Sequence, residues 1–387
     1  MMSVEEELQV VEKIGTALAE MISVQGDMIK SLTEKVNAQQ ALIMQLGENQ
    51  KRLLTEIAVG QHKTEAAQDN LFDTIVGASG SSDNIRDIFM NMPKAVGKDR
   101  LWQLITAETL NGLNRECRRS ESGMFLMYGT LIGAIRHAGF IPWDDDIDVG
   151  MRYADFARLY EYMTEEKDDE RSVRVQVSYN SRTRSVQCRA ESDDPSIPEC
   201  GAFTDIYVLR YLTDSSEDTR RRLIAERRQL NERFGQLNDK YAEFFAEKPE
   251  IEIPENAIIL DRDCDISVYD EAAVEAAEIA RGAEQRLIDM GMVSREAATD
   301  TLGHCIFTYD EEMELIRTDD VFPLAEAEFE GERYHIPRNY DEVLGNVYGN
   351  YMSLPHDMHI GHSDIALSYD DLKAIYESAR AANYNPK

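Results

Sequence analysis

Apolar residues recur at heptad spacing through residues 1–76, a segment without proline. With Val4 and Val11 at position a, apolar side chains fill the following d positions: Ile14, Met21, Met28 and Leu42. Helices with this repeat bury a and d against a partner, while the polar seam residues Gln25 and Lys35 would fix its register. We therefore predict an N-terminal coiled-coil helix that makes the chain a homo-oligomer, with an amphipathic helix folded onto the body as the alternative.

The heptad pattern gives way to the small polar stretch GASGSSD, so residues 77–95 are predicted to be a linker. Helix periodicity returns over 99–119. Strand-like runs then follow at 124–129, 146–151, 172–180, 184–192 and 202–212. Between the first two strands we expect a short helix over 130–139, which Thr130 caps and Gly139 ends.

The second half of the chain is richer in helix patterns. Within an insert at 215–300, helices are expected at 216–247, 270–290 and 294–301. A β-hairpin and a short helix follow within 321–355, and 366–387 form a C-terminal helix and tail. Since hairpins interrupt any βαβ repeat, we predict an α+β domain over 96–365, built on a mixed sheet with flanking helices rather than a doubly wound one.

Charge and cysteine content narrow the functional classes. The chain has 41 basic and 73 acidic residues, a net charge of −32, which disfavours nucleic acid and anionic lipid as partners. The five cysteines are scattered, as in a protein of a reducing compartment. The N-terminus is acidic, and no apolar run approaches the roughly 20 residues of a membrane span. We expect a cytoplasmic protein without a membrane span.

The stretch FIPWDDDIDVGM places four aspartates within five positions: Asp144, Asp145, Asp146 and Asp148. Carboxylates this close repel one another unless a cation lies among them. In a strand, Asp146 and Asp148 would leave the same face about 6–7 Å apart. Two such carboxylates suit Mg²⁺ or Mn²⁺ with added phosphate oxygens, so we expect a metal site. A solvated acidic loop is the alternative.

The residues around these acids suggest phosphate chemistry. Gly129 and Thr130 lie between a strand and a helix, where free N–H groups favour a phosphate. A strand, a Gly-Thr turn, a helix and a strand with Asp-x-Asp form the core arrangement of the nucleotidyltransferase fold. Asp205, a lone acid in a later apolar strand, is placed as the third acid; a partly exposed strand end is its alternative.

Three further side chains are candidates for substrate binding. Arg136 could neutralise phosphate oxygens. His137 could donate to phosphate or simply cap its helix. Trp143 could stack on a cytosine or a sugar, or serve as a packed anchor of its turn.

The stretch YGTLIGAIRHAGFIPWDDDIDVGMRYADFARL closely resembles the LicD family, which includes fukutin and the fukutin-related protein. Its signature spans Gly129 to Gly139 and Ile141 to Asp148, with Ile132 in place of leucine. The resemblance continues more thinly in AFTDIYVL and in the Phe-Glu-Gly and Tyr-Gly-x-Tyr-Met patterns of 321–355. It covers about residues 100–362.

The resemblance implies an enzyme that moves a phospho-alcohol, such as phosphocholine or an alditol phosphate, from a CDP-linked donor to a glycan hydroxyl. The products would be modified cell-surface polysaccharide, teichoic acid or lipopolysaccharide. Asp146 and Asp148 match the family's metal-binding acids, and Gly129 and Thr130 match its phosphate turn. Asp205 aligns less securely, because Tyr207-Val208 replaces Phe-Pro.

Roles in the reaction follow from this match. Asp205 is the first choice to align or deprotonate the acceptor hydroxyl and Asp145 the second, with Arg136 assisting at the phosphates. Two other functions stay open. One is a nucleotidyltransferase that transfers NMP from an NTP. The other is a coiled-coil scaffold with a degenerate catalytic domain.

Overall fold

The computed structural model describes residues 86–87, 89–165, 171–193, 201–294, 299–304, 315–353, 365 and 367–384. The coiled coil predicted over 1–76 lies outside the described residues.

The described helices are α5 (Gly97–Arg119), α6 (Tyr128–His137), α7 (Tyr153–Glu165), α8 (Glu217–Lys240), α9 (Ala242–Glu247), η2 (Glu255–Ala257), η3 (Ile266–Val268), α10 (Glu271–Asp289), α11 (Thr318–Val321), α12 (Tyr340–Tyr348) and α13 (Tyr369–Tyr384). The strands are β1 (Met124–Leu126), β2 (Asp148–Arg152), β3 (Val173–Asn180), β4 (Ser185–Ser192), β5 (Phe203–Leu212), β6 (Glu250–Glu252), β7 (Val293–Ser294), β8 (Thr301–Gly303), β9 (Leu315–Arg317), β10 (Ala325–Phe329) and β11 (Glu332–Ile336).

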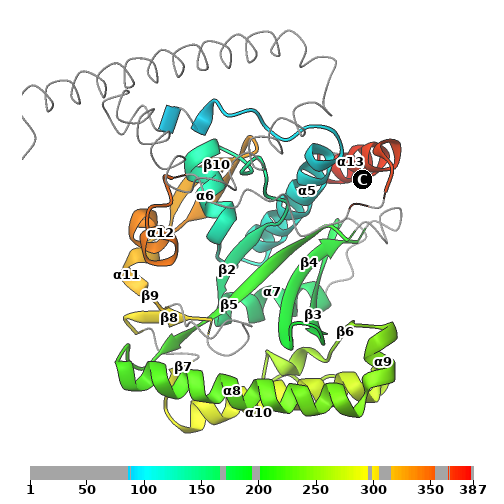
Figure 1. Cartoon of the computed structure of the whole chain (residues 1–387), viewed down its shortest axis with the longest axis vertical. Helices are drawn as coiled ribbons and strands as arrows, with labels where there is room; N and C mark the ends of the chain where they lie inside the picture. The colour runs from blue at the N-terminus through cyan, green and yellow to red at the C-terminus, as the bar shows by residue number, and fades with distance from the viewer. Residues whose placement is uncertain are drawn as a thin grey trace, which may run out of the picture. The chain divides into compact units, whose positions relative to one another are not determined.

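A mixed sheet forms the centre of the described part (Figure 1). Its strand order is β1-β2-β5-β4-β3-β6, in which β2 and β5 run parallel and the other neighbours antiparallel. The far half of β5 also pairs with β7 and β8, and β8 pairs with β9. The predicted mixed sheet and both predicted hairpins, β3–β4 and β10–β11, are confirmed.

The helices cover the sheet in groups. Helices α5 and α7 contact the central strands, and α13 packs along α5. Helices α8 and α10 pack together and run along one end of the sheet in Figure 1, while α6 lies toward the other end with α12. The core is continuous around the strands, with Val149, Val208 and Phe156 almost fully buried. Burying an aliphatic or aromatic side chain in this way contributes about 1.5–3 kcal/mol.

The prediction of a helix at 294–301 is wrong at both ends of that range, where the structure has short strands. Val293 and Ser294 form β7, which pairs with Leu212 and Tyr211 of β5. Thr301 begins β8, which pairs with the same part of β5. The backbone of this half of β5 needs hydrogen-bond partners, and pairing with two short strands supplies them. Local helix propensity is too weak to compete with that requirement.

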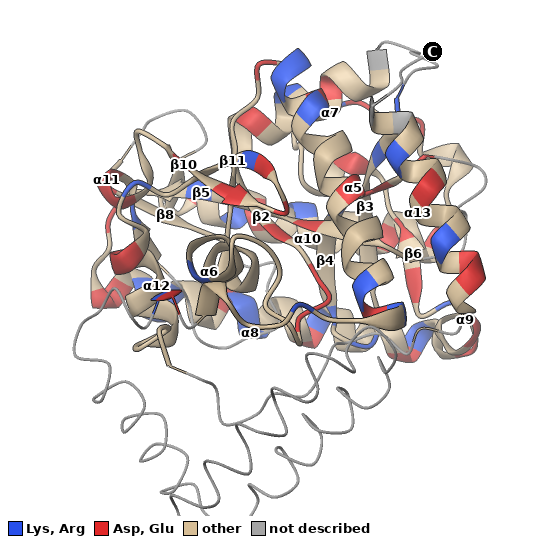
Figure 2. Ribbon diagram, turned by 90° about the horizontal axis from the view of Figure 1, so that it is seen from above, with Lys and Arg blue, Asp and Glu red and all other residues tan. Residues whose placement is uncertain are grey.

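Within the described residues, no helix is both long and apolar enough to cross a membrane. Acidic and basic positions are mixed along α13 and α7 in Figure 2.

Candidate active site

The start of α6 fixes the first acid of β2. The helix begins at Tyr128, two residues before the predicted cap, so Thr130 is not its N-cap. The Thr130 Oγ1 instead accepts a hydrogen bond from the backbone N–H of Asp148 at 2.8 Å. The Met127 N–H donates to the Asp148 carbonyl at 3.0 Å. Asp148 is therefore held against the turn that joins β1 to α6.

Gly129 lies where this turn meets the acidic stretch. A Cβ built on Gly129 would stand 2.7 Å from Oδ2 of Asp144. Without a side chain there, the Asp144 carboxylate lies against the first turn of α6, where N–H groups and the helix dipole favour negative charge. The turn thus leaves room for a carboxylate of the same motif beside Gly129. Its contact with phosphate stays a prediction.

The predicted geometry of Asp146 and Asp148 needs a correction. Strand β2 begins at Asp148, so Asp146 precedes the strand, and the two carboxylates are not neighbours on one strand face. The β1 pairing reaches only Val149, because the chain of β1 turns into α6 just beyond. The acids nevertheless stay close: burial raises the pKa of Asp148 well above its usual range, and repulsion from Asp146 raises it further.

Strand pairing brings the third predicted acid to the same place. In the parallel register of β2 and β5, Asp148 is the direct partner of Asp205. The Asp205 N–H donates to the Ile147 carbonyl at 2.8 Å, which locks this register. Neighbouring strands lie about 4.8 Å apart, so the two carboxylates start from adjacent positions of the sheet. Burial raises the pKa of Asp205, although Arg189 lowers it in part.

Arg189 on β4 is a contact of the site that the sequence prediction missed. Its Nε donates to Oδ1 of Asp205 at 2.8 Å, and its Nη1 donates to Oε1 of Glu250 at 2.6 Å. The signal in the sequence was an arginine inside a strictly alternating strand, RSVQCRAES. Its partners come from β5 and β6, which the alternation could not identify.

Helix α5 holds the acidic stretch from the other side. The Trp102 Nε1 donates to the Asp145 carbonyl at 3.1 Å, and the Gln103 Nε2 donates to the Asp144 carbonyl at 2.8 Å. Asp145 itself is buried. Gln103 lies among apolar residues in the stretch LWQLI, but nothing in that pattern identifies the Asp144 carbonyl as its hydrogen-bond partner.

Arg136 and His137 are directed into the protein. The Arg136 Nη1 donates to the carbonyls of Tyr351 and Ser353 at 2.7 and 3.1 Å. Its guanidinium stacks on the Phe89 ring at 4.3 Å. Burial lowers the pKa of Arg136 to about 10, while Asp144 opposes that shift. Arg136 thus anchors the turn after α12, and its action on phosphate stays a prediction.

His137 and Trp143 pack edge to face, with ring centroids 6.4 Å apart. Burial and the neighbouring Arg136 lower the pKa of His137 to about 3, so the imidazole is neutral near pH 7. Trp143 is partly buried against the core. These contacts fit the packed-anchor interpretation of Trp143, and its stacking on substrate stays a prediction.

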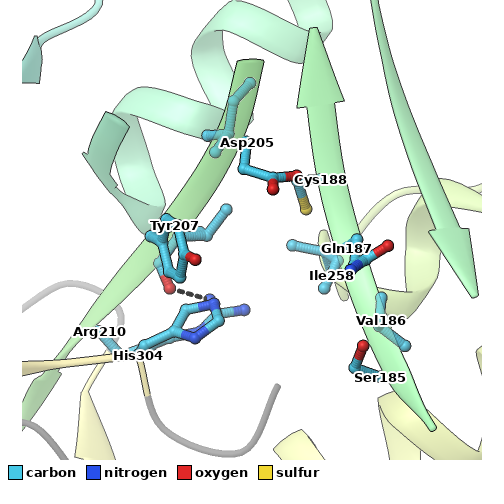
Figure 3. Close-up of a pocket in the computed structure, with 11 residues that line it drawn as sticks. Ser185, Val186, Gln187, Cys188, Asp205, Tyr207, Arg210, Ile258 and His304 are labelled. Atoms are coloured by element: carbon cyan, nitrogen blue, oxygen red, sulfur yellow. Dashed lines mark hydrogen bonds between the residues drawn. The ribbon is translucent and has the colours of Figure 1, made fainter. Parts of the chain in front are cut away.

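A cavity of about 50 Å³ adjoins Asp205 between β4 and β5. Figure 3 shows Asp205 extending from β5 toward β4, with Tyr207, His304 and Arg210 further along the cavity. The rings of Tyr207 and His304 lie 5.0 Å apart, and Tyr207 also packs against Tyr128. A hydrogen bond from Tyr207 helps to lower the pKa of Asp148, against the larger effect of burial.

The acids do not form a closed metal centre by themselves. Among the described residues, no group of three or more His, Cys, Asp or Glu side chains is arranged to hold a metal ion. Within that part of the chain, a cation at these acids would need further ligands besides their carboxylates. That requirement fits magnesium, which commonly takes one or two carboxylates together with phosphate oxygens.

Comparison with known proteins agrees with this geometry. Residues 122–207 match the family model described as LicD/FKTN/FKRP, nucleotidyltransferase domain. The chain is 24% identical over 265 residues to the lipopolysaccharide cholinephosphotransferase LicD of Haemophilus influenzae, covering 66% of this chain and 92% of that protein. It is also 38% identical over 52 residues to an uncharacterised protein of Rickettsia prowazekii, covering 13% of this chain and 20% of that protein.

The matched region begins just before β1 and ends two residues after Asp205, so it contains the whole acidic cluster. This match confirms the resemblance to the LicD family that the motif residues indicated. Residues 122–207 are therefore similar to the nucleotidyltransferase domain of the LicD family.

Proposed function

We propose that the chain is a metal-dependent phosphotransferase, which moves phosphocholine or an alditol phosphate from a CDP-linked donor to a hydroxyl of a cell-surface glycan. The observation that supports this most is the register that pairs Asp148 with Asp205 inside the LicD-family region. The Haemophilus relative is named for the transfer of phosphocholine to lipopolysaccharide, a reaction of the same class.

Asp146 and Asp148 are the residues that would hold Mg²⁺ or Mn²⁺. Their oxygen ligands are of the kind these hard cations prefer. Asp148 is buried beside other carboxylates, an arrangement that costs free energy unless positive charge offsets it. Once bound, the ion would offset the charge that develops on the diphosphate and the departing CMP.

The side chains of this domain account for the remaining steps. The donor diphosphate lies against Gly129 and Thr130 at the start of α6. The acceptor oxygen attacks the phosphorus of the phospho-alcohol, and its new bond forms as the bond to CMP breaks. Asp205 takes the proton that the hydroxyl loses, and Asp145 is the second choice for this role. Such a transfer depends on positioning and charge neutralisation rather than on covalent catalysis.

A CMP-release assay tests the proposal. The full chain is mixed with CDP-choline, CDP-glycerol or CDP-ribitol, with or without a glycan acceptor, in Mg²⁺, Mn²⁺ or EDTA. We expect CMP release that requires donor, acceptor and metal. Asp148→Asn should lower kcat by about 100-fold or more, since it removes charge where the transition state needs it.

The control is Asp193→Asn, which makes the same change at an exposed position just after β4 and should leave the rate unchanged. Full activity in EDTA, or in a folded Asp148→Asn variant, would contradict the metal role. Pyrophosphate release from an NTP in place of CMP release would favour NMP transfer. Absence of both activities, with no binding of metal or CDP, would favour the scaffold.

A further inference from the structure

Arg189 lies between two carboxylates on the face of the sheet that carries the site. It is the cross-strand partner of Asp205, and its Nε donates to Oδ1 of that residue at 2.8 Å. Its Nη1 donates to Oε1 of Glu250 at 2.6 Å, and the Phe203 ring stacks on the guanidinium at 3.9 Å. The Arg189 side chain is only 11% exposed. A rigid planar group held at three places has little freedom to turn.

The far anchor of this arrangement is itself fixed. The Glu250 carboxylate on β6 also accepts hydrogen bonds from Ser178 Oγ at 2.9 Å and from Asn180 Nδ2 at 3.3 Å. Both donors belong to β3, the direct partner of β6. A continuous chain of hydrogen bonds therefore runs from β3 and β6 through Arg189 to Asp205.

This chain leaves the two oxygens of Asp205 in different situations. Oδ1 accepts the charge-assisted bond from Arg189, a strong and directional contact. In the part of the chain that the structure describes, Arg189 is the hydrogen-bond partner seen for the Asp205 carboxylate. Holding one oxygen fixes the plane of the carboxylate and therefore the direction of Oδ2.

Other arginines near the sheet make different contacts. Arg136 bonds to the carbonyls of the turn after α12. Arg210 forms a fully buried ion pair with Glu284, and Arg152 pairs with Asp155. Arg189 differs from these three because its ion-pair partner is an acid of the proposed site.

We propose that Arg189, braced by Glu250, is a positioning residue that orients the Asp205 carboxylate toward the acceptor hydroxyl. This inference rests on the proposed function, in which Asp205 takes the proton of that hydroxyl. Arg189 acts through Asp205 and does not itself bind the donor. It should therefore govern kcat rather than the KM for the CDP-linked donor.

Steady-state CMP release by the full chain provides the test. Arg189→Met keeps an unbranched side chain about as long as the arginine stem and removes both charge-assisted bonds, so kcat should fall about 30- to 100-fold while the donor KM changes less than about 3-fold. Arg189→Lys retains the charge and should recover part of the loss. Glu250→Gln should give a smaller fall of about 3- to 10-fold, because the brace is weakened but Arg189 remains.

The decisive comparison is a double-mutant cycle with Asp205→Asn. If Arg189 acts through Asp205, the double variant should be no more than about 2-fold slower than Asp205→Asn alone, since residues that act as a unit are not additive. Full additivity of the two losses would overturn the inference. So would a rise in donor KM at unchanged kcat, which would mark Arg189 as a phosphate ligand.

Arg174→Met is the matched control. Arg174 also forms a cross-strand ion pair, with Glu191 at 3.0 Å, but its side chain is 53% exposed. The same substitution there should leave kcat and KM unchanged. If Arg189→Met fails to fold, Arg189→Lys and Glu250→Gln carry the test, and equal activity of both to the wild type would overturn the inference. A wild-type chain that releases no CMP would instead refute the proposed function.

Discussion

At the scale of single residues, the motif supplies the chemistry and distant side chains supply its geometry. The sequence identified the acids and the Gly-Thr turn, because those residue types are unusual at that spacing. It did not identify Trp102, Gln103 or Arg189, whose hydrogen bonds reach the acids from α5 and β4. Such contacts depend on packing between elements, which local periodicity does not encode.

Gly129 offers a test at this scale. In Gly129→Ala, the new Cβ would approach Oδ2 of Asp144 to 2.7 Å, so that carboxylate must rotate away from the turn. Because a flexible side-chain end can move cheaply, the free energy of unfolding should change by less than about 1 kcal/mol. The kcat for CMP release should fall about 10-fold or more, as the donor diphosphate loses its close approach to the backbone.

The control for this change is Gly345→Ala on α12, where nothing lies within 4 Å of the new Cβ. That helical position should gain about 0.5–1 kcal/mol of stability, with activity unchanged. Unfolding in urea and CMP release separate the two effects. A fully active Gly129→Ala enzyme would show that the turn does not contact the donor.

At the scale of elements, the β10–β11 hairpin acts as a clamp on the motif. Its turn residue Glu330 donates its N–H to the Ala138 carbonyl and accepts from the Phe140 N–H, at the end of α6. The same carboxylate binds Arg100 of α5 and Lys94. This explains why a Phe-Glu-Gly pattern nearly 200 residues away accompanies the acidic motif.

The clamp predicts a pH dependence. Burial raises the pKa of Glu330, but hydrogen bonds from Arg100 and Lys94 outweigh it and bring the pKa to about 2. A carboxyl whose pKa is lower in the folded state adds stability above its unfolded pKa, near 4.5, and loses that contribution as the pH falls toward 2. Glu330→Gln should therefore cost on the order of 2–3 kcal/mol at pH 7.

The stability gap between wild type and Glu330→Gln should narrow between pH 5 and pH 3, measured by urea unfolding with tryptophan fluorescence. Glu326→Gln, on the same hairpin, is the control. Its partner Arg333 lies 3.4 Å away and both side chains are exposed, so the change should cost about 0–1 kcal/mol. If the difference in free energy of unfolding between wild type and Glu330→Gln stays constant over this pH range, the ionised Glu330 carboxylate does not stabilise the hairpin contact.

Most elements were predictable from local patterns, and the misses share one cause. The hairpins, the strands around the motif and helices α5, α10 and α13 follow the predicted elements closely. The start of α6, the start of β2 and strands β7 and β8 do not. Each of these boundaries is set by a hydrogen-bond partner in a separate element, and tertiary pairing outweighs propensity there.

At the scale of the whole molecule, self-association through residues 1–76 stays a prediction. Light scattering on the full chain should give an oligomer, and the seam double variant Met21→Asp and Met28→Asp should lower its mass, because buried aspartates oppose helix pairing. Ser23→Asp and Lys30→Asp, at the outward f positions of the same heptads, are the control and should leave the mass unchanged. A monomeric wild type would contradict the coiled coil.

The strand order has a consequence for how the chain is made. Strand β5 is inserted between β2 and β4, although both are synthesised before it. Until β5 emerges, β2 and β4 present backbone donors and acceptors along open edges, which are prone to join other chains. During that interval Asp148 also lacks its cross-strand partner Asp205. A ribosome-bound chain that stops before β5 therefore lacks the paired acids and is open to misassembly along those edges.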